Sequence, residues 1–303
     1  IILGTVLGGV LISSTVSQSL LGWDMPTLDT GIDTPAESAI LIIMMIYVVA
    51  ALINLKIPDT GARYVSQKTN PIELIKDFSI CFKTLWNDRL GQISLAVTTL
   101  FWGAGATLQF IVIKWAQVSL HLTLSQGAIL QAISAVGVAG GAVWAAWRIP
   151  LRDSLKVLPY GIVMGLVVCI LAIYNADMLP NTTLMTIGKL ELSLNLLPAY
   201  FLLIIVGWLA GYFVVPMNAL LQHRGHVLMS AGHSIAVQNF NENISVLTML
   251  LVYSLLIWLD APIQFVIIGF GLAVSVIMWL VIKRHARNQA EYDSMHLIGE
   301  HKH

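Results

Sequence analysis

The sequence predicts an all-α, polytopic membrane helix bundle, and two observations support this fold class. Hydrophobic residues make up 57% of the 303 residues and charged residues only 11%, whereas soluble domains contain about 25% charged residues. The apolar residues also gather in stretches of about 20, which is the length of a helix that crosses the hydrocarbon core of a bilayer. With a mean hydropathy of +0.81, a soluble fold would leave much of its apolar surface in water, so we expect the chain to lie in a membrane.

Eight apolar stretches are long enough to span the bilayer. In chain order they are residues 1–21, 38–55, 92–118, 124–147, 157–176, 196–221, 229–259 and 262–282. The first stretch has no basic leader and no cleavage site, so we expect a membrane helix already under way rather than a signal peptide, with a further N-terminal portion before it.

Small residues within these stretches are spaced for helix packing. Glycines recur four residues apart at Gly4/Gly8, Gly137/Gly141, Gly161/Gly165 and Gly207/Gly211. Such pairs let two helix backbones approach closely in lipid. Since they occur in four different stretches, they predict one compact bundle.

The connections are short except for residues 22–37, 56–90 and 177–195, which are expected to be loops or linkers. Within the long polar segment 56–90, residues 71–90 have apolar side chains at helical spacing: Ile72, Ile75, Phe78, Phe82, Leu85 and Trp86. This pattern is typical of an amphipathic helix that lies on a membrane surface.

The basic residues predict an orientation. Of the 16 Lys and Arg, 14 lie in segment 56–90, after the fourth, sixth or last stretch. Cytoplasmic connections have such an excess of Lys and Arg, so these segments and both chain ends are expected in the cytoplasm. Residues 22–37 contain neither Lys nor Arg and are expected outside.

The seventh stretch contains an unusual number of polar residues. At about 100° per residue, one helix face holds Ser234, Gln238, Asn241, Glu242 and Ser245. Ionisable groups within a bilayer cost about 2.5–3.5 kcal/mol on insertion scales, and they usually face a cavity or a partner. Three interpretations are open: the face lines a translocation path, with Glu242 pairing with a cation or substrate amine; it clamps helices by hydrogen bonds; or it stays wet among the headgroups.

Two other stretches contain candidate residues. In the third, Trp102 and Gln109 belong to a polar stripe that also includes Thr98 and Gly105. Lys114, near the outer end, is expected either to extend its ammonium to the headgroups or to anchor a lipid phosphate. In the sixth stretch Pro216 predicts a kink. Near it, Asn218 would bond the freed backbone or face a cavity.

Signals for catalysis and for cofactors are absent from the sequence. No HEXXH, GXSXG, Walker-type glycine loop or H-x4-D motif occurs. The two cysteines, Cys81 and Cys169, have neither disulfide nor metal spacing. The formal net charge of zero gives no reason to expect nucleic acid. We therefore expect a protein that is not an enzyme and needs no metal or cofactor.

Three segments resemble the bacterial lysophospholipid transporter family of the major facilitator superfamily: residues 100–110 (LFWGAGATLQF), 213–225 (FVVPMNALLQHRG) and 231–243 (AGHSIAVQNFNEN). The resemblance extends in order over nearly the whole chain. It implies the major facilitator fold, two six-helix halves joined by a long cytoplasmic loop, with the first four helices lacking here. Residues 1–55 would be the last two helices of the N-terminal half, 56–90 the inter-half linker, 91–284 the C-terminal six-helix half and 285–303 a cytoplasmic tail.

The resemblance also implies a function. Such proteins move lysophosphatidylethanolamine and lysophosphatidylglycerol from the outer to the inner leaflet of the bacterial inner membrane, where a cytosolic-side acyltransferase/acyl-carrier-protein synthetase reacylates them. The substrate would lie between the halves, which rock to give alternating access. The expected substrate contacts are Trp102, Gln109, Lys114, Asn218, Gln238, Asn239 and Glu242. Asn239 is included on the resemblance alone, and Gln109 stands where family members have an arginine.

Two alternatives remain open at this point. A proton-coupled exporter of drugs or small amphiphiles would use Glu242 as a proton carrier. A non-transporting membrane partner of the acyltransferase would have no polar cavity and would bind through the helix at 71–90. A membrane-bound enzyme ranks third, because no catalytic constellation is visible in the sequence.

Overall fold

A computed structural model describes residues 34–58, 70–187 and 190–299. In these residues seven helices are long and apolar enough to span a membrane, which confirms the last seven predicted stretches. The first stretch, residues 1–21, lies outside the described residues. The chain divides into two compact units, residues 1–70 and 71–303.

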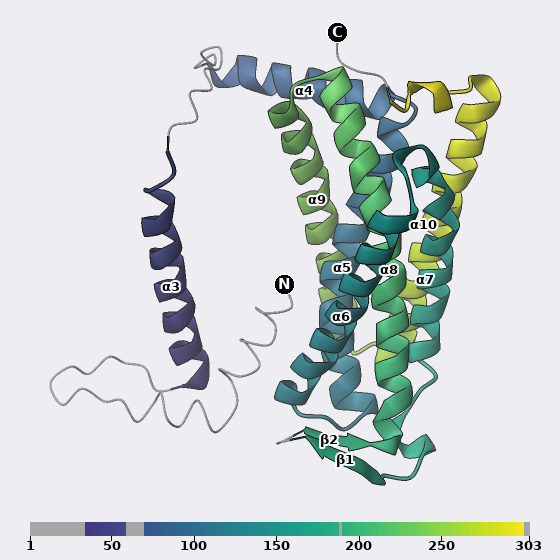
Figure 1. Cartoon of the computed structure of the whole chain (residues 1–303). Coiled ribbons are helices and arrows are strands. Elements are labelled where there is room, and N and C mark those ends of the chain that lie inside the picture. Colours follow the sequence, from purple (N-terminus) through teal and green to yellow (C-terminus); the bar gives the residue numbers. More distant parts are fainter. Residues whose placement is uncertain (1–33, 59–69, 188–189, 300–303) are drawn as a thin grey trace, which may run out of the picture. The chain divides into compact units, whose positions relative to one another are not determined.

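In the first unit the structure describes one helix, α3 (Pro35–Asn54) (Figure 1). It begins with a capping box. The Thr34 hydroxyl accepts a hydrogen bond from the Glu37 backbone N–H at 3.4 Å, and the Glu37 carboxylate accepts one from the Thr34 N–H at 2.9 Å. These two bonds satisfy backbone donors that a helix start leaves open, and Pro35 needs no such partner.

In the described residues of the second unit, six long helices follow one another in up-and-down order and are preceded by α4 (Pro71–Asn87) (Figure 1). They are α5 (Gly91–Ser119), α6 (Leu124–Arg148), α7 (Leu158–Leu171), α8 (Leu197–Leu228), α9 (Ala231–Trp258) and α10 (Ile263–Glu291). The closest neighbours are α6 with α8, α7 with α10 and α5 with α9. Short 3-10 helices, η1 (Leu151–Val157), η2 (Ala176–Met178), η3 (Leu194–Leu196) and η4 (Met295–Leu297), occupy the connections and the C-terminal segment.

Glycine pairs hold the closest helix contact. A Cβ atom added to Gly137 of α6 would lie 2.4 Å from the Ile204 carbonyl oxygen, and one added to Gly141 would lie 2.0 Å from the Trp208 carbonyl oxygen. In return, a Cβ atom on Gly207 of α8 would lie 2.1 Å from the Ser134 carbonyl oxygen. Side chains do not fit at such distances, so the two backbones touch directly, as predicted from the spacing.

The remaining glycine pairs differ in outcome. Gly161 and Gly165 of α7 face α10, where a Cβ atom on Gly165 would lie 2.5 Å from the Gly271 carbonyl oxygen. The pair Gly4/Gly8 lies outside the described residues. Three of the four predicted pairs therefore stand at helix contacts, which confirms packing into one bundle for residues 71–299.

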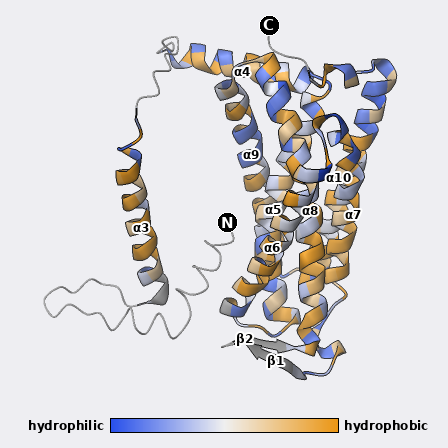
Figure 2. Ribbon diagram, viewed as in Figure 1, coloured by the Kyte–Doolittle hydropathy of each residue, from blue (hydrophilic) through white to orange (hydrophobic). Residues whose placement is uncertain are grey.

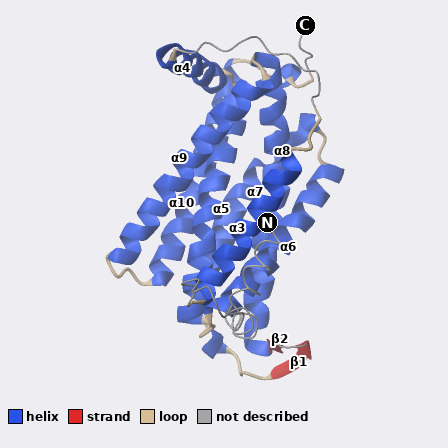
Figure 3. Ribbon diagram, turned by 90° about the vertical axis from the view of Figure 1, so that its left-hand side faces the viewer, coloured by secondary structure: helices blue, strands red, loops and turns tan. Residues whose placement is uncertain are grey.

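The two ends of this bundle differ. The end with α4 is called the linker end below, and the opposite end holds an antiparallel hairpin of β1 (Thr183–Ile187) and β2 (Leu190–Ser193) (Figures 1 and 3). Residues 177–195, predicted to be a loop, thus include two short strands. Figure 2 shows apolar residues along the length of the long helices, with polar residues concentrated toward the linker end.

The last helix is longer than predicted. The last apolar stretch ends at residue 282, but α10 continues to Glu291. Ile298, which follows η4, is only 2% exposed and packs in the apolar cluster with Leu90 and Phe213. Part of the predicted tail 285–303 is therefore packed against the linker end of the bundle.

Candidate functional site

The polar face predicted in the seventh stretch lies on the N-terminal half of α9. Ser230 caps this helix, and its hydroxyl accepts a hydrogen bond from the His233 backbone N–H at 3.4 Å. Ser234, Asn241 and Glu242 are 4%, 8% and 9% exposed. The other two members of the face, Gln238 and Ser245, are partly buried. All five therefore face the inside of the unit, as predicted from the helical angle.

Gln238 joins two of the expected site residues. Its side-chain Nε2 donates to Glu242 Oε1 at 2.7 Å within α9, and to Asn218 Oδ1 at 3.3 Å on α8. Asn218 follows Pro216 by two residues, in the segment where the proline removes a backbone donor. Asn218 thus uses its amide oxygen for a bond between two helices.

Glu242 has no ionic partner in the part of the chain that the structure describes. Among the described residues, ion pairs involve Arg89, His121, Lys156 and Arg224, and none reaches Glu242. Its recorded hydrogen bond comes from a neutral amide. A carboxylate with so little compensation attracts any cation that enters, because burial weakens its hydration.

On the α5 side of the site, one glycine is packed against α9 and another has free space beside it. A Cβ atom on Gly103 would lie 2.1 Å from the Ser245 hydroxyl of α9, so the two helices touch there. A Cβ atom on Gly105 would meet nothing within 4 Å. Trp102 is 39% exposed, and its ring meets that of Phe101 edge to face at 5.8 Å. Gln109 is also exposed.

The structure therefore separates the seven expected residues into two groups. Asn218, Gln238 and Glu242 meet in one hydrogen-bonded cluster. The others are exposed on the surface of unit 71–303: Trp102, Gln109, Lys114 and Asn239. Substrate contact remains a prediction for all seven.

A contact that was not predicted from sequence joins α4 to the same helix. The Trp86 indole N–H donates to Asn241 Oδ1 at 3.3 Å, next to Glu242. The rings of Phe78 and Phe82 lie 5.1 and 6.1 Å from the ring of Phe240, both edge to face. The amphipathic helix is present as the sequence predicts, but the aromatic side chains of its apolar face contact α9.

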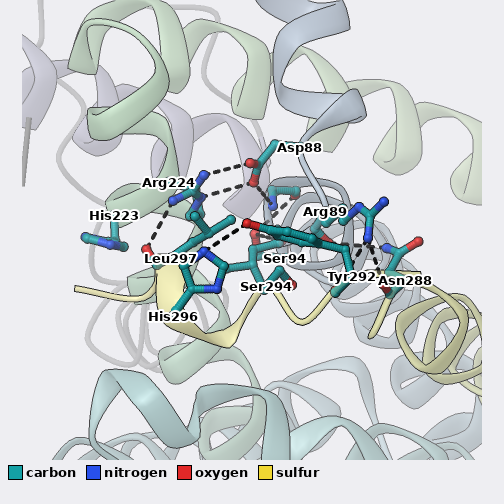
Figure 4. Close-up of polar contacts among 12 residues, drawn as sticks. Asp88, Arg89, Ser94, His223, Arg224, Asn288, Tyr292, Ser294, His296 and Leu297 are labelled. Carbon is teal, nitrogen blue, oxygen red and sulfur yellow. Dashed lines mark hydrogen bonds and ion pairs between the residues drawn. The ribbon is translucent and has the colours of Figure 1, made fainter. Parts of the chain in front are cut away.

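A buried ion pair fixes the start of α5 at the linker end (Figure 4). Arg224 of α8 donates from Nε and Nη2 to the two carboxylate oxygens of Asp88, at 3.1 and 2.7 Å. Its Nη1 donates to the Leu297 carbonyl oxygen at 3.2 Å, and Asp88 also accepts from the Gly91 N–H at 2.7 Å. Arg224 is only 3% exposed, so its charge is compensated inside the protein by these contacts and not by water.

A second contact set holds the C-terminal segment against α5 (Figure 4). Arg89 donates to the carbonyl oxygens of Asn288 at 3.0 Å and Tyr292 at 3.4 Å, and its guanidinium lies 5.1 Å from the centre of the Tyr292 ring. On α8, His223 Nε2 accepts from the Gly299 N–H at 3.1 Å. Residues separated by up to 203 positions thus meet here, which sequence spacing cannot reveal.

Comparison with known proteins gives relatives but no structural template. No family model matches the chain, and no solved structure matches it. The chain is 35% identical over 284 residues to proteins named lysophospholipid transporter LplT from Escherichia coli O1:K1 / APEC and from Shigella boydii serotype 4 (strain Sb227). These alignments cover 91% of the chain and 66% of each relative, so the chain spans just under two thirds of their length.

The similarity extends over nearly all of the membrane helices that the structure describes. Two of the three segments that resemble the family, 213–225 and 231–243, include the cluster residues Asn218, Gln238 and Glu242. The sequence is 35% identical to these relatives over 91% of the chain. The structure has the membrane-spanning helices that the resemblance predicts for the described residues. The chain belongs to the lysophospholipid transporter family.

Proposed function

We propose that the chain takes part in moving lysophospholipids from the outer to the inner leaflet of a bacterial inner membrane. The observation that supports this most is the 35% identity, over 91% of the chain, to proteins named lysophospholipid transporters. Lysophosphatidylethanolamine and lysophosphatidylglycerol are the proposed substrates, and the product would be reacylated by a cytosolic-side acyltransferase. The protein would act as a transporter and not as an enzyme.

The Asn218–Gln238–Glu242 cluster is the proposed contact for the polar headgroup. Its carboxylate is buried, and the other two side chains of the cluster are neutral amides. The ammonium of lysophosphatidylethanolamine would supply the missing cation, and the amides of Gln238 and Asn218 would exchange their mutual bond for bonds to the headgroup. Trp102, Gln109 and Asn239, which are exposed on α5 and α9, would line the path.

Lys114 has a separate proposed role. It is exposed, five residues from the end of α5 at Ser119, on the hairpin side of the bundle. An ammonium at this depth reaches the headgroups, where it would contact a lipid phosphate before the lipid enters. With the positive segments placed in the cytoplasm, this is the outer leaflet.

One observation favours a second candidate, a proton-coupled exporter of small amphiphiles. A buried carboxylate without a fixed cation can also take up and release a proton during transport. In that case Glu242 would couple export to protonation. The two functions differ in direction and in substrate.

Uptake of labelled lysophosphatidylethanolamine, read out as reacylated product, tests the proposal. The gene that encodes this chain would be expressed in a strain without its own lysophospholipid transporter. We expect uptake to be restored, and unlabelled lysophosphatidylglycerol to compete while a cationic dye does not. Good expression without uptake, together with dye export that depends on the proton gradient, would favour the exporter instead.

A further inference from the structure

A cluster of aromatic rings surrounds the last residue of α6. The guanidinium carbon of Arg148 lies 5.4 Å from the centre of the Trp144 ring and 5.1 Å from that of Trp147. The two indoles meet edge to face at 6.0 Å. Arg148 is exposed, and Trp144 and Trp147 are 44% and 75% exposed. The arginine is therefore held by two ring faces at the surface of the bundle.

Neighbouring helices extend this cluster. Trp208 and Tyr212 of α8 stack at 5.0 Å with an angle of 9° between their planes. Tyr160 of α7 meets Tyr212 edge to face, also at 5.0 Å. Arg148 is close enough to Tyr212 for its charge to act on the phenol group. Three helices thus contribute to one amphipathic surface.

In the part of the chain that the structure describes, the charge of Arg148 has no ionic partner. Among the described residues, no carboxylate pairs with it and no hydrogen bond to its guanidinium is recorded. The next basic residues are Arg152, which is exposed, and Lys156. Asp153 is the one acidic residue in this connection, and it already pairs with Lys156 at 2.9 Å. The surface has an excess of positive charge.

The depth of Arg148 limits what can bind to it. The part of α6 that is long and apolar enough to span a membrane runs from Gln126 to Arg148, so we expect the guanidinium at the end of the hydrocarbon core. Trp and Tyr concentrate at this level in membrane proteins. Basic pockets between membrane helices bind anionic lipid headgroups there. Arginine on ring faces keeps its N–H edges available for the oxygens of a phosphate.

From this geometry we propose that Arg148, with Trp144 and Trp147, forms a binding site for the phosphate of an anionic phospholipid such as phosphatidylglycerol. The lipid belongs to the leaflet at the linker end and is a resident of the site, not the transported molecule. A headgroup with a quaternary ammonium fits less well, because Arg148 already covers the ring faces that would bind such a cation. The proposal does not depend on transport.

Native mass spectrometry of the purified, delipidated protein with added phosphatidylglycerol tests the site. We expect Arg148→Gln to weaken phosphatidylglycerol binding about tenfold, as for the loss of one charge-assisted contact. Arg148→Lys keeps the charge but loses the paired donors, and is expected to weaken it about threefold. Arg287→Gln is the matched control, since Arg287 is an exposed arginine on α10 with no ring contact recorded. It should bind like the unmodified protein.

Two further measurements distinguish a lipid phosphate from free inorganic phosphate as the ligand. Phosphatidylcholine at the same concentration should bind at least several-fold more weakly than phosphatidylglycerol, and millimolar inorganic phosphate should not displace the lipid. Equal losses for Arg148→Gln and Arg287→Gln would overturn the proposal, as would equal binding of phosphatidylcholine. Displacement by inorganic phosphate would show that the site reads a free anion and would likewise contradict it. The Arg148→Lys protein keeps the test decisive if Arg148→Gln folds poorly.

Discussion

Glu242 is a buried carboxylate without an ion pair among the described residues. It is 9% exposed, and its recorded partner is the neutral amide of Gln238. A lone buried carboxylate is costly, so its surroundings gain stability whenever a cation or proton arrives. This makes Glu242 the side chain expected to respond most to a charged substrate. Its neighbour Asn241 is bonded to Trp86 of α4.

At the same scale, the ion pair of Arg224 with Asp88 is expected to stabilise the fold. The two side chains are 3% and 10% exposed, and removing one partner of a buried pair costs about 3–5 kcal/mol. We therefore expect Arg224→Met to lower the midpoint of thermal unfolding by several degrees. Lys156→Met is the control, because Lys156 and Asp153 form an exposed pair and such pairs contribute about 1 kcal/mol or less. Equal midpoints for the two variants would contradict a stabilising role.

At the scale of the helices, the contact of α6 with α8 depends on the absence of side chains. Gly137 and Gly141 meet carbonyl oxygens of α8, and Gly207 and Gly211 meet those of α6. The pairing is reciprocal, so neither helix can move away from an added methyl group without losing the contacts of the other pair. Packing and not the hydrophobic effect holds such helices together in lipid.

Gly141→Ala should therefore lower the thermal stability of the protein in detergent. The added methyl group would lie 2.0 Å from the Trp208 carbonyl oxygen, and the helices must separate to admit it. Gly105→Ala is the matched control, since an added Cβ atom there meets nothing within 4 Å. Alanine also favours a helix over glycine by up to about 1 kcal/mol. A Gly141→Ala protein as stable as the Gly105→Ala protein would disprove the close approach.

Cys81 gives a pH-dependent test of how α4 packs. Burial, and secondly the charge of Asp77, raise the pKa of the Cys81 thiol. Since the thiolate is the reactive form, we expect slow maleimide labelling at neutral pH and a rate that rises with pH beyond the range where an exposed cysteine levels off. Asp77→Asn removes one cause, lowers the pKa and should speed labelling at neutral pH. The measurement uses a Cys169→Ser protein, so that only Cys81 is labelled. If Cys81 reacts as fast as a solvent-exposed cysteine at every pH, the packing of α4 is contradicted.

The helices could be predicted from sequence better than the contacts between them. The bilayer sets the length of each apolar stretch, so seven predicted spans match helices. The polar face of α9 follows from its angular spacing in the same way. In contrast, the bonds of Gln238 to Asn218 and of Arg224 to Asp88 depend on how separate helices rotate and pack, and the latter pair is 136 positions apart. The hairpin at 183–193 was missed because a short alternating run between two helices resembles a loop.

At the scale of the whole molecule, the bundle of residues 71–299 is asymmetric along its axis. The described connections that contain Lys and Arg lie at the linker end, as the up-and-down helix order requires, and the hairpin lies at the other end (Figure 1). In membrane proteins, the connections on the cytoplasmic side have an excess of Lys and Arg. We therefore infer that the linker end faces the cytoplasm.

This orientation predicts which side of the membrane each cysteine probe reacts from. At pH 8.5, a membrane-impermeant maleimide should label Cys81 in inside-out vesicles but not in intact cells, in a Cys169→Ser protein. A second probe is Asn181→Cys, which lies before the hairpin, in a protein that lacks the two native cysteines. We expect the maleimide to label it in cells whose outer membrane is permeabilised, but not in inside-out vesicles. Labelling of Cys81 in such cells would contradict the inferred orientation.

The most direct test of the proposed transport site is lysophosphatidylethanolamine uptake by the Glu242→Ala protein compared with the Asn243→Ala protein. Asn243 lies one residue further along α9, is exposed and donates only to the Asn239 carbonyl oxygen in the contacts recorded. At equal expression, we predict that Glu242→Ala abolishes uptake, because the buried carboxylate that would receive the substrate ammonium is gone, while Asn243→Ala retains most of it. Normal uptake by the Glu242→Ala protein would contradict a role for the Asn218–Gln238–Glu242 cluster in substrate binding.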